Sequence, residues 1–542
     1  MNQGYGGCAL RIVIGITILG LLLAGSATAA TLTVCPGGCV YSRIQAAVDA
    51  SSNGDTILVQ SGPYYENVNV NKQLTLSGIG MPVVDARGSG SAITLAANGI
   101  TLEGFTATGS SSNTEAGIRV SSISNTLSGN NASNNFYGIY LDSSSNNNTL
   151  SGNNAYYNNV SGISLSASNN NTLIENNASY NNGSGILLSS SSNNKLSGNN
   201  ASNNSAGIYL WSSSNNNMLS GNDASNNTYG IFLYPSSNNN MLSGNNAKSN
   251  GIVGIYLVLS SNNTLIGNNA SNNDIGIFQF ADSNNNTLSG DNASNNREGI
   301  YLASSSNNTL SGNDANSNAQ DGINLANSSN NTLIGNNASK SNSGTGIHLD
   351  LSGNNILIGN NASNNLLYGI YLNDSSNYNT LSSNNVSSNN NSGIYLASSS
   401  NNKIYNNYFS NTNNAFDDGN NIWNINKTFG TNIINGTFSG GNFWSDYAGN
   451  DTDGDGLGNT MLPYNSSGRI ANGGDFLPLT IVPQLHDILS YYRGLGNDSN
   501  VVETTDLLKA ADDWSNNIAP PGFASPITTQ QLLSLADEWS KS

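Results

Sequence analysis

The stretch GIYLASSSNNTLSGNDANSN, residues 299–318, recurs in close copies through most of the chain. Its first four residues define a marker, Gly-Ile-x-Leu, which begins at Gly138, Gly162, Gly185, Gly207, Gly230, Gly254, Gly299, Gly322, Gly346, Gly369 and Gly393. Variant copies start at Gly117 and Gly276, and the mean period from Gly117 to Gly393 is 23 residues. Self-similarity at a fixed period of this size is typical of proteins that stack one structural unit on the next.

Each period predicts one coil of three short strands. In GIYL the Ile and the Leu are two residues apart, so they share one face of an extended strand and the Tyr points the other way. The Leu of NTLSGN and the Ala of NASNN supply further inward positions, while Asn, Ser and Gly tolerate the conformations of the corners. Asn residues at equivalent positions in neighbouring coils are expected to form side-chain hydrogen-bond ladders.

Two other repeat folds do not fit this pattern. Leucine-rich repeats need a different leucine spacing, and a left-handed β-helix is built from hexapeptides, of which 23 is not a multiple. The sequence therefore predicts an all-β fold, a right-handed parallel β-helix of thirteen or more coils. At roughly 4.8 Å per coil, thirteen coils give a rod of about 60 Å.

Composition restricts the partners. Only 9% of the 542 residues are charged, and the net charge is −17. Six basic side chains fall between residues 117 and 412: Arg119, Lys195, Lys248, Arg297, Lys340 and Lys403. Nucleic-acid binders concentrate Lys and Arg, so neither nucleic acid nor an anionic membrane surface is an expected partner.

Residues 1–29 have the pattern of a secretory signal peptide. Arg11 precedes the apolar run IVIGITILGLLLAG, and the small-residue stretch SATAA follows as a cleavage site. An uncleaved membrane anchor is the alternative, although the run is short for a membrane span. No later segment of the sequence is long and apolar enough to cross a bilayer. The mature chain is predicted to be secreted and to reside at the cell surface.

Two cysteines remain after the signal segment, Cys35 and Cys39 in VCPGGCV. In an oxidising compartment a local disulfide between them is expected. A metal site at this place would need further ligands, and the neighbouring sequence offers none.

Two segments resemble known families. SRIQAAVDASSNGDTILVQSGPYYENVNVNKQLTLSG resembles the opening of pectin-lyase-like parallel β-helix proteins, in which a short amphipathic helix, here with Ile44, Ala47 and Val48, caps the first coil. The repeats resemble those of NosD-like β-helix proteins, which occur among secreted surface proteins of methanogenic archaea, and NFWSDYAGNDTDGDGLGN is similar to the end of that domain. The resemblance covers residues 31–480 and implies the fold. It does not imply an activity, because this fold carries lyases, hydrolases, epimerases, adhesins and scaffolds.

Beyond residue 480 the sequence predicts three short helices. The first places Leu485, Ile488, Leu489 and Tyr492 on one face. TTDLLKAADDW (504–514) and TQQLLSLADEW (529–539) match at an offset of 25, with apolar faces formed by Leu507, Ala511, Trp514 and by Leu532, Ala536, Trp539. The module resembles a dockerin whose loops lack the acidic ligands. The sequence predicts five segments. They are the signal peptide (1–29), the N-terminal cap with the first coils (30–116), the regular 23-residue repeats (117–412), the C-terminal coils (413–480) and the helical module (481–542).

One charged cluster is a candidate catalytic centre. When the coils are aligned on the marker Gly, Asp274 and Arg297 occupy one position in adjacent coils, and Glu298 and Asp321 occupy the next. Stacked carboxylates of this kind serve hydrolases or cation sites, whereas a salt-bridge ladder on a solvated corner is the structural alternative, which we favour. His348 is predicted to be an isolated surface substitution, and the motifs of polygalacturonase-type hydrolases are absent.

The outward marker position predicts an aromatic column in five successive coils, Tyr209, Phe232, Tyr256, Phe278 and Tyr301. Such a column either stacks on sugar rings or another rod, or simply stabilises the sheet. Met218 and Met241 also fall in adjacent coils. Copper(I) prefers thioether ligands, but two Met without His or Cys are too few, so replacement of a surface Thr is the better interpretation. N-glycosylation patterns recur, for example at Asn131, Asn147, Asn177 and Asn269.

The segment NDTDGDGLGN predicts a structural calcium site. Asp451, Asp453 and Asp455 alternate as oxygen ligands of a calcium loop do, and the Leu457 carbonyl and Asn459 follow at positions 7 and 9. Position 12 is Leu462, so the usual Glu is missing, and a more remote acid, Asp446 or Asp475, is expected to complete the shell. An acidic turn without metal is the alternative.

These observations predict a non-enzymatic, secreted surface protein with a structural, adhesive or glycan-binding role, whose partners are polysaccharide or other envelope proteins. A polysaccharide lyase or hydrolase and a NosD-like metal-handling protein are the alternatives.

Overall fold

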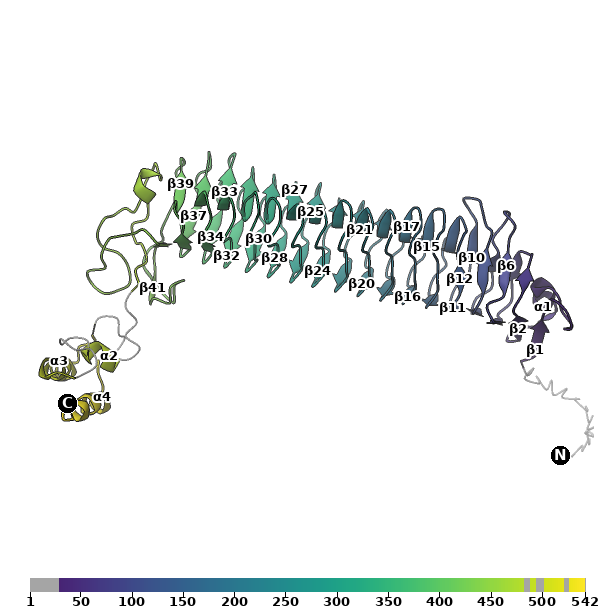
Figure 1. Cartoon of the computed structure of the whole chain (residues 1–542), viewed down its shortest axis with the longest axis horizontal. Helices are drawn as coiled ribbons and strands as arrows, with labels where there is room; N and C mark the ends of the chain where they lie inside the picture. Colours follow the sequence, from purple (N-terminus) through teal and green to yellow (C-terminus); the bar gives the residue numbers. More distant parts are fainter. Residues whose placement is uncertain (1–28, 482–487, 494–501, 521–525, 542) are drawn as a thin grey trace, which may run out of the picture.

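A computed structural model describes residues 29–481, 488–493, 502–520 and 526–541. Figure 1 shows a long rod of stacked coils, with one helix at its first end and three helices beyond its last coil. The helices are α1 (Ile44–Ala50), α2 (Ile488–Arg493), α3 (Thr504–Ser515) and α4 (Thr529–Trp539), with a short 3-10 turn at Ser466–Gly468. The signal-peptide prediction falls on residues 1–28, outside the described residues, as do Leu485 and His486.

One wall of the rod is a parallel sheet of 16 strands, here called the marker sheet because it contains the Gly-Ile-x-Leu segments. In order along the rod its strands are β4 (Val68–Val70), β7 (Ile93–Leu95), β10 (Ala116–Val120), β13 (Tyr137–Leu141), β15 (Ser161–Ser166), β17 (Ser184–Ser189), β19 (Ala206–Trp211), β21 (Tyr229–Tyr234), β23 (Val253–Val258), β25 (Ile275–Phe280), β27 (Glu298–Ala303), β29 (Ile323–Ala326), β31 (Ile347–Asp350), β33 (Tyr368–Asn373), β36 (Ser392–Leu396) and β39 (Ala415–Asp417).

A second wall is a parallel sheet of 17 strands, one per coil, called the second sheet. Its strands are β1 (Thr31–Val34), β2 (Thr56–Gln60), β5 (Thr75–Ile79), β8 (Thr101–Glu103), β11 (Thr126–Ser128), β14 (Thr149–Ser151), β16 (Thr172–Ile174), β18 (Lys195–Ser197), β20 (Met218–Ser220), β22 (Met241–Ser243), β24 (Thr264–Ile266), β26 (Thr287–Ser289), β28 (Thr309–Ser311), β30 (Thr332–Ile334), β32 (Ile356–Ile358), β34 (Thr380–Ser382) and β37 (Lys403–Tyr405).

The third wall differs from the prediction of a third strand in every coil. It has regular strands only near the ends: β3 (Pro63–Tyr64), β6 (Val83–Asp85), β9 (Thr106–Thr108), β12 (Asn131–Ala132), and β35 (Asn385–Ser387), β38 (Tyr408–Ser410), β42 (Phe443–Trp444). In the coils between, a single bridging residue pairs with its equivalent in the next coil, as Asn177 does with Asn200. These single bridging residues, from Asn154 to Asn361, are here called the bridge row. A separate antiparallel pair joins β40 (Thr428–Phe429) and β41 (Phe438–Ser439).

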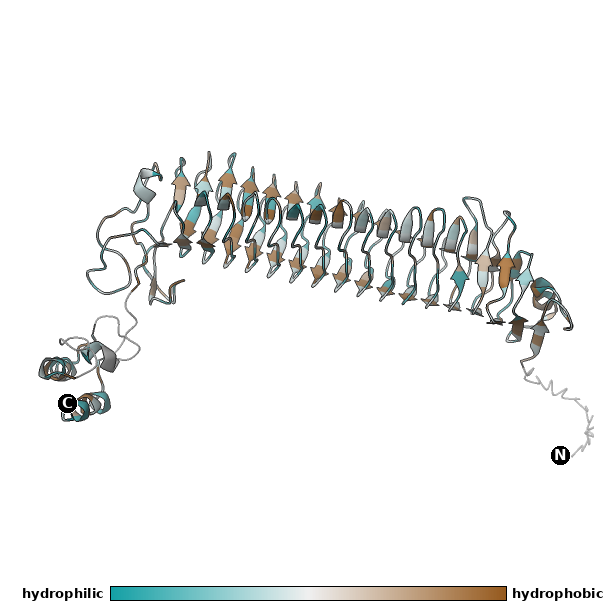
Figure 2. Cartoon of the chain, in the orientation of Figure 1, coloured by the Kyte–Doolittle hydropathy of each residue, from teal (hydrophilic) through white to brown (hydrophobic). Residues whose placement is uncertain are grey.

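The inward residues of all three walls form one continuous core. Ile255 and Leu257 on β23 are fully buried, and Ile255 pairs in register with Ile231 and Ile277 on the neighbouring strands. Figure 2 shows brown, hydrophobic bands on the strands, between paler and teal ones. The prediction that Ile and Leu of the repeat point inward is confirmed, and so is the parallel β-helix.

Three rows of buried asparagines run along the corners of the rod, over residues 125 to 421, 130 to 442 and 135 to 414. In each row the side-chain oxygen of one Asn accepts the backbone N–H of the equivalent residue one coil earlier. Asn148 Oδ1, for example, accepts from both the backbone N and the Nδ2 of Asn125, each at 2.8 Å. A corner cannot complete a strand ladder, so these amides satisfy backbone groups that would otherwise be buried without a partner. The predicted asparagine ladders are confirmed.

The first coil is closed by α1, as predicted. Ile44, Ala47 and Val48 are buried against the core. The Glu66 carboxylate accepts the backbone N–H groups of Ile44 and Gln45 at 2.7 and 3.1 Å, which satisfies two of the free donors at the helix start. A disulfide joins Cys35 and Cys39 beside this cap.

The C-terminal helices pack differently from the prediction. The side chains of Tyr492, Ala510 and Leu535 form their core, whereas Trp514 and Trp539 are 44% and 42% exposed. Leu507 and Leu532 pack against this core as predicted, whereas Ala510 and Leu535 take the places predicted for Ala511 and Ala536. The physical reason is a buried polar contact, since a carboxylate of α3, Asp513, turns inward to accept the Tyr492 hydroxyl at 3.0 Å. No helix in the described ranges is long and apolar enough to cross a membrane.

One member of the second asparagine row is an aspartate. Asp291 is fully buried, and its Oδ1 accepts the backbone N–H and the Nδ2 of Asn268 at 2.7 and 2.9 Å. Its Oδ2 occupies the place of a donating amide and is buried without a hydrogen-bond partner. Burial raises the pKa of Asp291 to about 6, because nothing on that side stabilises the ionised form.

We expect Asp291→Asn to stabilise the rod at neutral pH. A carboxyl with a folded-state pKa of about 6, against the ordinary 3.8, contributes stability that is complete below pH 3.8 and is lost as the pH rises through 6. The substitution should raise the free energy of unfolding by about 3 kcal/mol at pH 7.5, and this pH-linked gain should vanish below pH 4. Urea unfolding at both pH values measures it. Asp314→Asn, at a half-exposed bridge-row position, is the control, and an equal pH-linked gain in both variants would contradict the assignment.

Candidate functional site

The predicted catalytic cluster lies on the outward face of the marker sheet, at β25, β27 and β29. Arg297 donates from Nε to Asp274 Oδ1 and from Nη1 to Glu298 Oε1, each at 2.7 Å. Asp321 makes no such contact with Glu298, and its Oδ1 instead accepts the backbone N–H of Thr345 at 2.8 Å. Glu298 and Asp321 thus contact different partners and do not form the close acid pair that retaining glycosidases use.

His348 is not isolated, and the prediction that it is a lone surface substitution is wrong. Its Nδ1 lies 3.0 Å from Asp321 Oδ2, and its Nε2 lies 3.0 Å from Asn373 Oδ1. Burial alone would lower the pKa of His348, but the hydrogen bond and charge of Asp321 outweigh it and raise the pKa. Sequence alignment on the marker missed this pair because the two residues occupy different positions of adjacent coils and meet diagonally.

Both ring nitrogens of His348 thus lie within hydrogen-bond distance of a side-chain oxygen. Neither nitrogen is free to take a proton from a substrate. The cluster therefore consists of two sets of contacts, Arg297 with Asp274 and Glu298 and Asp321 with His348, as in the structural alternative of a salt-bridge ladder on a half-exposed face. Glu298 Oε2 is buried without a hydrogen-bond partner among the described residues.

The aromatic column is continuous over the five predicted coils. Successive ring centroids from Tyr209 to Tyr301 lie 4.9, 4.9, 5.0 and 4.9 Å apart, with planes within 8° of parallel. Each inner ring has a neighbour on both faces, so the column presents ring edges and hydroxyls to solvent. Because sugars stack on ring faces, this geometry favours a stabilising role in the sheet; glycan stacking on the column stays a prediction.

A surface hollow of about 400 Å³ was missed by the sequence analysis. It is lined by ten residues of the third wall and the adjoining turns, among them Phe136, Tyr157, Tyr180, Asn159 and Asn182. Tyr157 and Tyr180 lie on adjacent coils with ring centroids 5.5 Å apart, and they are 57% and 52% exposed. Their signal in the sequence is two aromatic residues at a turn position that holds Asn in most other coils.

The backbone at this turn position has a positive φ in every regular coil, 53° at Tyr157, 56° at Tyr180 and 59° at Asn203. Bulky side chains avoid this conformation, and Asn tolerates it. The two tyrosines therefore stand at a backbone conformation that Asn adopts more readily than Tyr.

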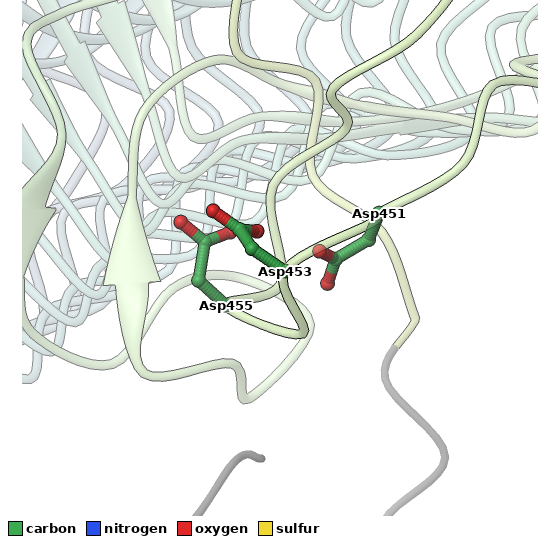
Figure 3. A group of neighbouring side chains, drawn as sticks. All are labelled: Asp451, Asp453 and Asp455. Atoms are coloured by element: carbon green, nitrogen blue, oxygen red, sulfur yellow. The ribbon is translucent and has the colours of Figure 1, made fainter.

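The acidic loop brings the predicted calcium ligands together. The ligand atoms of Asp451, Asp453 and Asp455 all lie within 4.8 Å of one another, on one tight loop near the end of the rod (Figure 3). Asp451 also accepts the N–H groups of Gly454 and Gly456, each at 2.7 Å. Carboxylates at this separation repel one another without a cation.

The surroundings of the loop depart from the prediction. The Nζ of Lys427 pairs with Asp455, and the side-chain oxygen of Asn459 accepts the Thr452 N–H at 2.6 Å. The expectation that Asp446 or Asp475 completes the shell is wrong. Asp475 is fully buried and accepts the indole N–H of Trp444 at 2.8 Å, while Asp446 accepts the Tyr464 hydroxyl at 2.6 Å. The Leu457 side chain is buried.

The methionine pair is exposed. Met218 and Met241 pair in register on β20 and β22 and are 44% and 41% exposed. Their register neighbours are Lys195 and Thr264. Within the described residues, neither His nor Cys stands beside them in this row, and both remaining cysteines are joined in a disulfide.

Comparisons with known proteins agree with this architecture. The family model described as "Periplasmic copper-binding protein (NosD)" matches residues 48–223 and 278–449, and the one described as "Right handed beta helix region" matches residues 212–315. A "Cell surface glycoprotein" of Methanothermus fervidus is 38% identical over 97 residues, which span 16% of this chain and 16% of that relative.

Two solved structures resemble this chain at low sequence identity. The A-module of the Azotobacter vinelandii mannuronan C-5 epimerase AlgE4 is 16% identical, with 63% of this chain and 89% of that chain covered and a TM-score of 0.35. Pectate lyase Pel9A is 16% identical, with 50% and 80% covered and a TM-score of 0.31. At this distance neither carries an argument about function.

We expect the acidic loop to bind calcium. Titration of the chelator-treated protein by calorimetry should show one saturable calcium site, which Asp453→Ala with Asp455→Ala abolishes. Lys427→Met should tighten binding several-fold, because it removes a positive charge that competes for Asp455. Asp282→Ala, an exposed turn acid elsewhere on the rod, is the control. Binding that survives the double substitution, or no saturable binding, would show that the loop is an acidic turn without metal.

Proposed function

The chain belongs to the NosD family, and on that premise we propose that it is an exported, non-enzymatic β-helix of the cell surface that binds glycans through the hollow at Tyr157 and Tyr180. The location is supported by the archaeal relative named as a cell surface glycoprotein. Its partners in this proposal are polysaccharide or other components of the envelope.

The exposed tyrosine pair carries the proposal. Two rings stand on adjacent coils in a shallow hollow whose remaining lining is mostly Asn and Ser. Exposed aromatic faces pack on sugar rings, and side-chain amides and hydroxyls exchange hydrogen bonds with sugar hydroxyls. Since a tyrosine at this left-handed turn costs backbone energy, the pair is better explained by binding than by folding.

The non-enzymatic part of the proposal is supported by the charged cluster. Arg297 pairs with both Asp274 and Glu298, and Asp321 contacts His348. An enzyme that cleaves or epimerises a polysaccharide needs an acid or base free to exchange a proton with substrate. A group committed to a salt bridge or to two hydrogen bonds is poorly placed for that task.

The copper named in the family description does not fit the donor set of the described residues. Copper(I) favours thiolate and thioether ligands. Cys35 and Cys39 are oxidised to a disulfide, and Met218 and Met241 form an exposed pair without a third soft ligand. His348 is already held by Asp321 and Asn373. We therefore derive no role through copper for this chain.

The surface location has a direct test. We expect a membrane-impermeant amine-reactive label, applied to intact cells that make the protein, to modify exposed lysines of the rod such as Lys195 and Lys403. A cytoplasmic protein measured in the same cells is the control for cell integrity. Labelling that appears only after the cells are broken would contradict the proposed location.

Substitutions that should leave the fold unchanged test glycan binding. Tyr157→Asn with Tyr180→Asn places at each turn the residue found at Asn203, so the rod should keep its unfolding midpoint. On an array of envelope and plant polysaccharides, binding should fall at least tenfold in this double variant. Glu298→Ala with Asp321→Ala should leave binding unchanged. Wild-type binding that is unaffected by loss of both tyrosines would refute the hollow as the site, and depolymerisation lost in the Glu298 and Asp321 variant would refute the non-enzymatic assignment.

A further inference from the structure

A single row of asparagines on the rod has the geometry of a modification site. We infer that this turn row carries N-linked glycans, an inference that rests on the proposed extracellular location. The turn row consists of the six asparagines Asn147, Asn170, Asn262, Asn285, Asn307 and Asn330, each followed two residues later by a Thr on the second sheet. Asn-x-Thr is the pattern that N-glycosylation requires.

The structure leaves the amides of the turn row available. All six side chains are exposed, at backbone φ values between 56° and 60°. Their backbone N–H groups bond to the next coil, as Asn262 N does to Asn284 O at 3.0 Å. Within the described residues, none of the six side-chain amides donates or accepts a hydrogen bond. Modification there breaks no contact of the fold.

The Thr of each pattern is accessible to solvent, as its Asn is. In the copy that begins at Asn262, the intervening Asn263 is buried in the first asparagine row, while Thr264 is half-exposed. Asn262 and Thr264 are thus both accessible to solvent, on either side of a buried residue. An enzyme that reads Asn and Thr together therefore finds both on the outer surface of the folded rod.

The other frequent pattern, Asn-Ala-Ser in the bridge row, is structurally different. Asn177 Nδ2 donates to Asn154 Oδ1 at 2.6 Å, and Asn361 Nδ2 donates to Asn337 Oδ1 at 3.0 Å. The Ser of the pattern, such as Ser179, is buried and donates to Asn177 Oδ1 at 2.7 Å. These asparagines are half-buried and their amide nitrogens are engaged, so the folded rod excludes them as acceptors.

Three coils supply natural negative controls. Asn193, Asn216 and Asn239 share the exposure and the positive φ of the turn row. In place of the Thr they have Lys195, Met218 and Met241. The fold accepts these residues at the Thr position, so the sequence pattern can be removed or created there without disturbing the coil.

Spacing limits how many sites one molecule can fill. Asn262, Asn285, Asn307 and Asn330 occupy the same position of four consecutive coils, since their threonines pair in register. Neighbouring acceptors are thus about 4.8 Å apart, which is narrower than a hydrated sugar chain. Glycans on adjacent coils collide, so one molecule carries glycans on at most alternate coils of this run.

The chemistry is a group transfer from outside the chain. The Asn Nδ2 forms a bond to the anomeric carbon of a glycosyl phosphate donor, the bond from that carbon to the phosphate oxygen breaks, and Nδ2 gives up one proton. The phosphate departs with the electron pair. A separate transferase supplies the donor and the base, and the rod supplies the exposed amide.

The experiment is glycopeptide mapping by mass spectrometry of the protein purified from the cells that make it. We expect glycans at turn-row asparagines, no glycan at Asn177 or Asn361, and intact molecules without adjacent occupancy in the run from Asn262 to Asn330. Two variants made in the same cells sharpen the test. Thr287→Met should remove the glycan at Asn285 and raise occupancy at Asn262 and Asn307. Met241→Thr should create a glycan at Asn239 and lower occupancy at Asn262.

Glycans on the bridge row, turn-row asparagines that are bare, or occupancy that ignores the neighbouring coil would overturn the inference. These outcomes are independent of the surface-labelling test. A protein that is labelled on intact cells but bare in the turn row refutes the inference alone, whereas a protein that is never labelled refutes the proposed location.

Discussion

The whole rod depends on the hydrogen bond between an asparagine side chain and the backbone of the coil before it. A β-helix must turn three corners in every coil, and a corner cannot complete the ladder of a sheet. Buried amides between residues 125 and 442 supply most of the missing acceptors, and Asp291 and Ser341 stand at two positions of these rows. Many of the amides also donate to their neighbour in the row, as Asn176 Nδ2 does to Asn199 Oδ1 at 2.9 Å. In the third row the Nδ2 groups of Asn227, Asn250, Asn273 and Asn296 are buried without a partner in the described part of the chain. A chain so rich in Asn is therefore ordered because its polar groups are buried in register.

This constraint explains why charge is scarce in the coils. A row of identical neutral amides can repeat indefinitely, since each is both donor and acceptor, whereas a row of identical charges 4.8 Å apart repels itself. Asp291 shows the consequence of a single exchange, with one buried oxygen left without a partner. On the outer face, Asp274 and Arg297 occur as an opposite pair in adjacent coils. Stacking of equivalent positions therefore favours neutral residues in the buried rows and opposite charges in adjacent coils on the outer face.

The sequence predicts the contacts between equivalent positions of neighbouring coils. It does not predict the contacts between non-equivalent positions. The period, the inward Ile and Leu, the asparagine rows and the capping helix all follow from equivalent positions stacking on one another. His348 meets Asp321 diagonally, and Lys427 reaches Asp455 from 28 residues away along an irregular loop, so alignment on the marker Gly finds neither contact. Asp475 shows the same limit, because a carboxylate expected at the calcium loop is instead committed to the Trp444 indole inside the last coil.

The binding site that we propose lies where the repeat departs from the residue that suits its backbone. Most departures from the consensus are neutral, as Met218 and Met241 are at an exposed Thr position. Tyr157 and Tyr180 are different, because each replaces an asparagine at a left-handed turn that asparagine suits better. Asn therefore has different roles in the buried corner rows and at the exposed turns. In the buried rows Asn bonds the backbone of the neighbouring coil and is not accessible. At the exposed turns Asn mainly forms the turn, so the surface can exchange it for a ring or, in our inference, carry a sugar chain there.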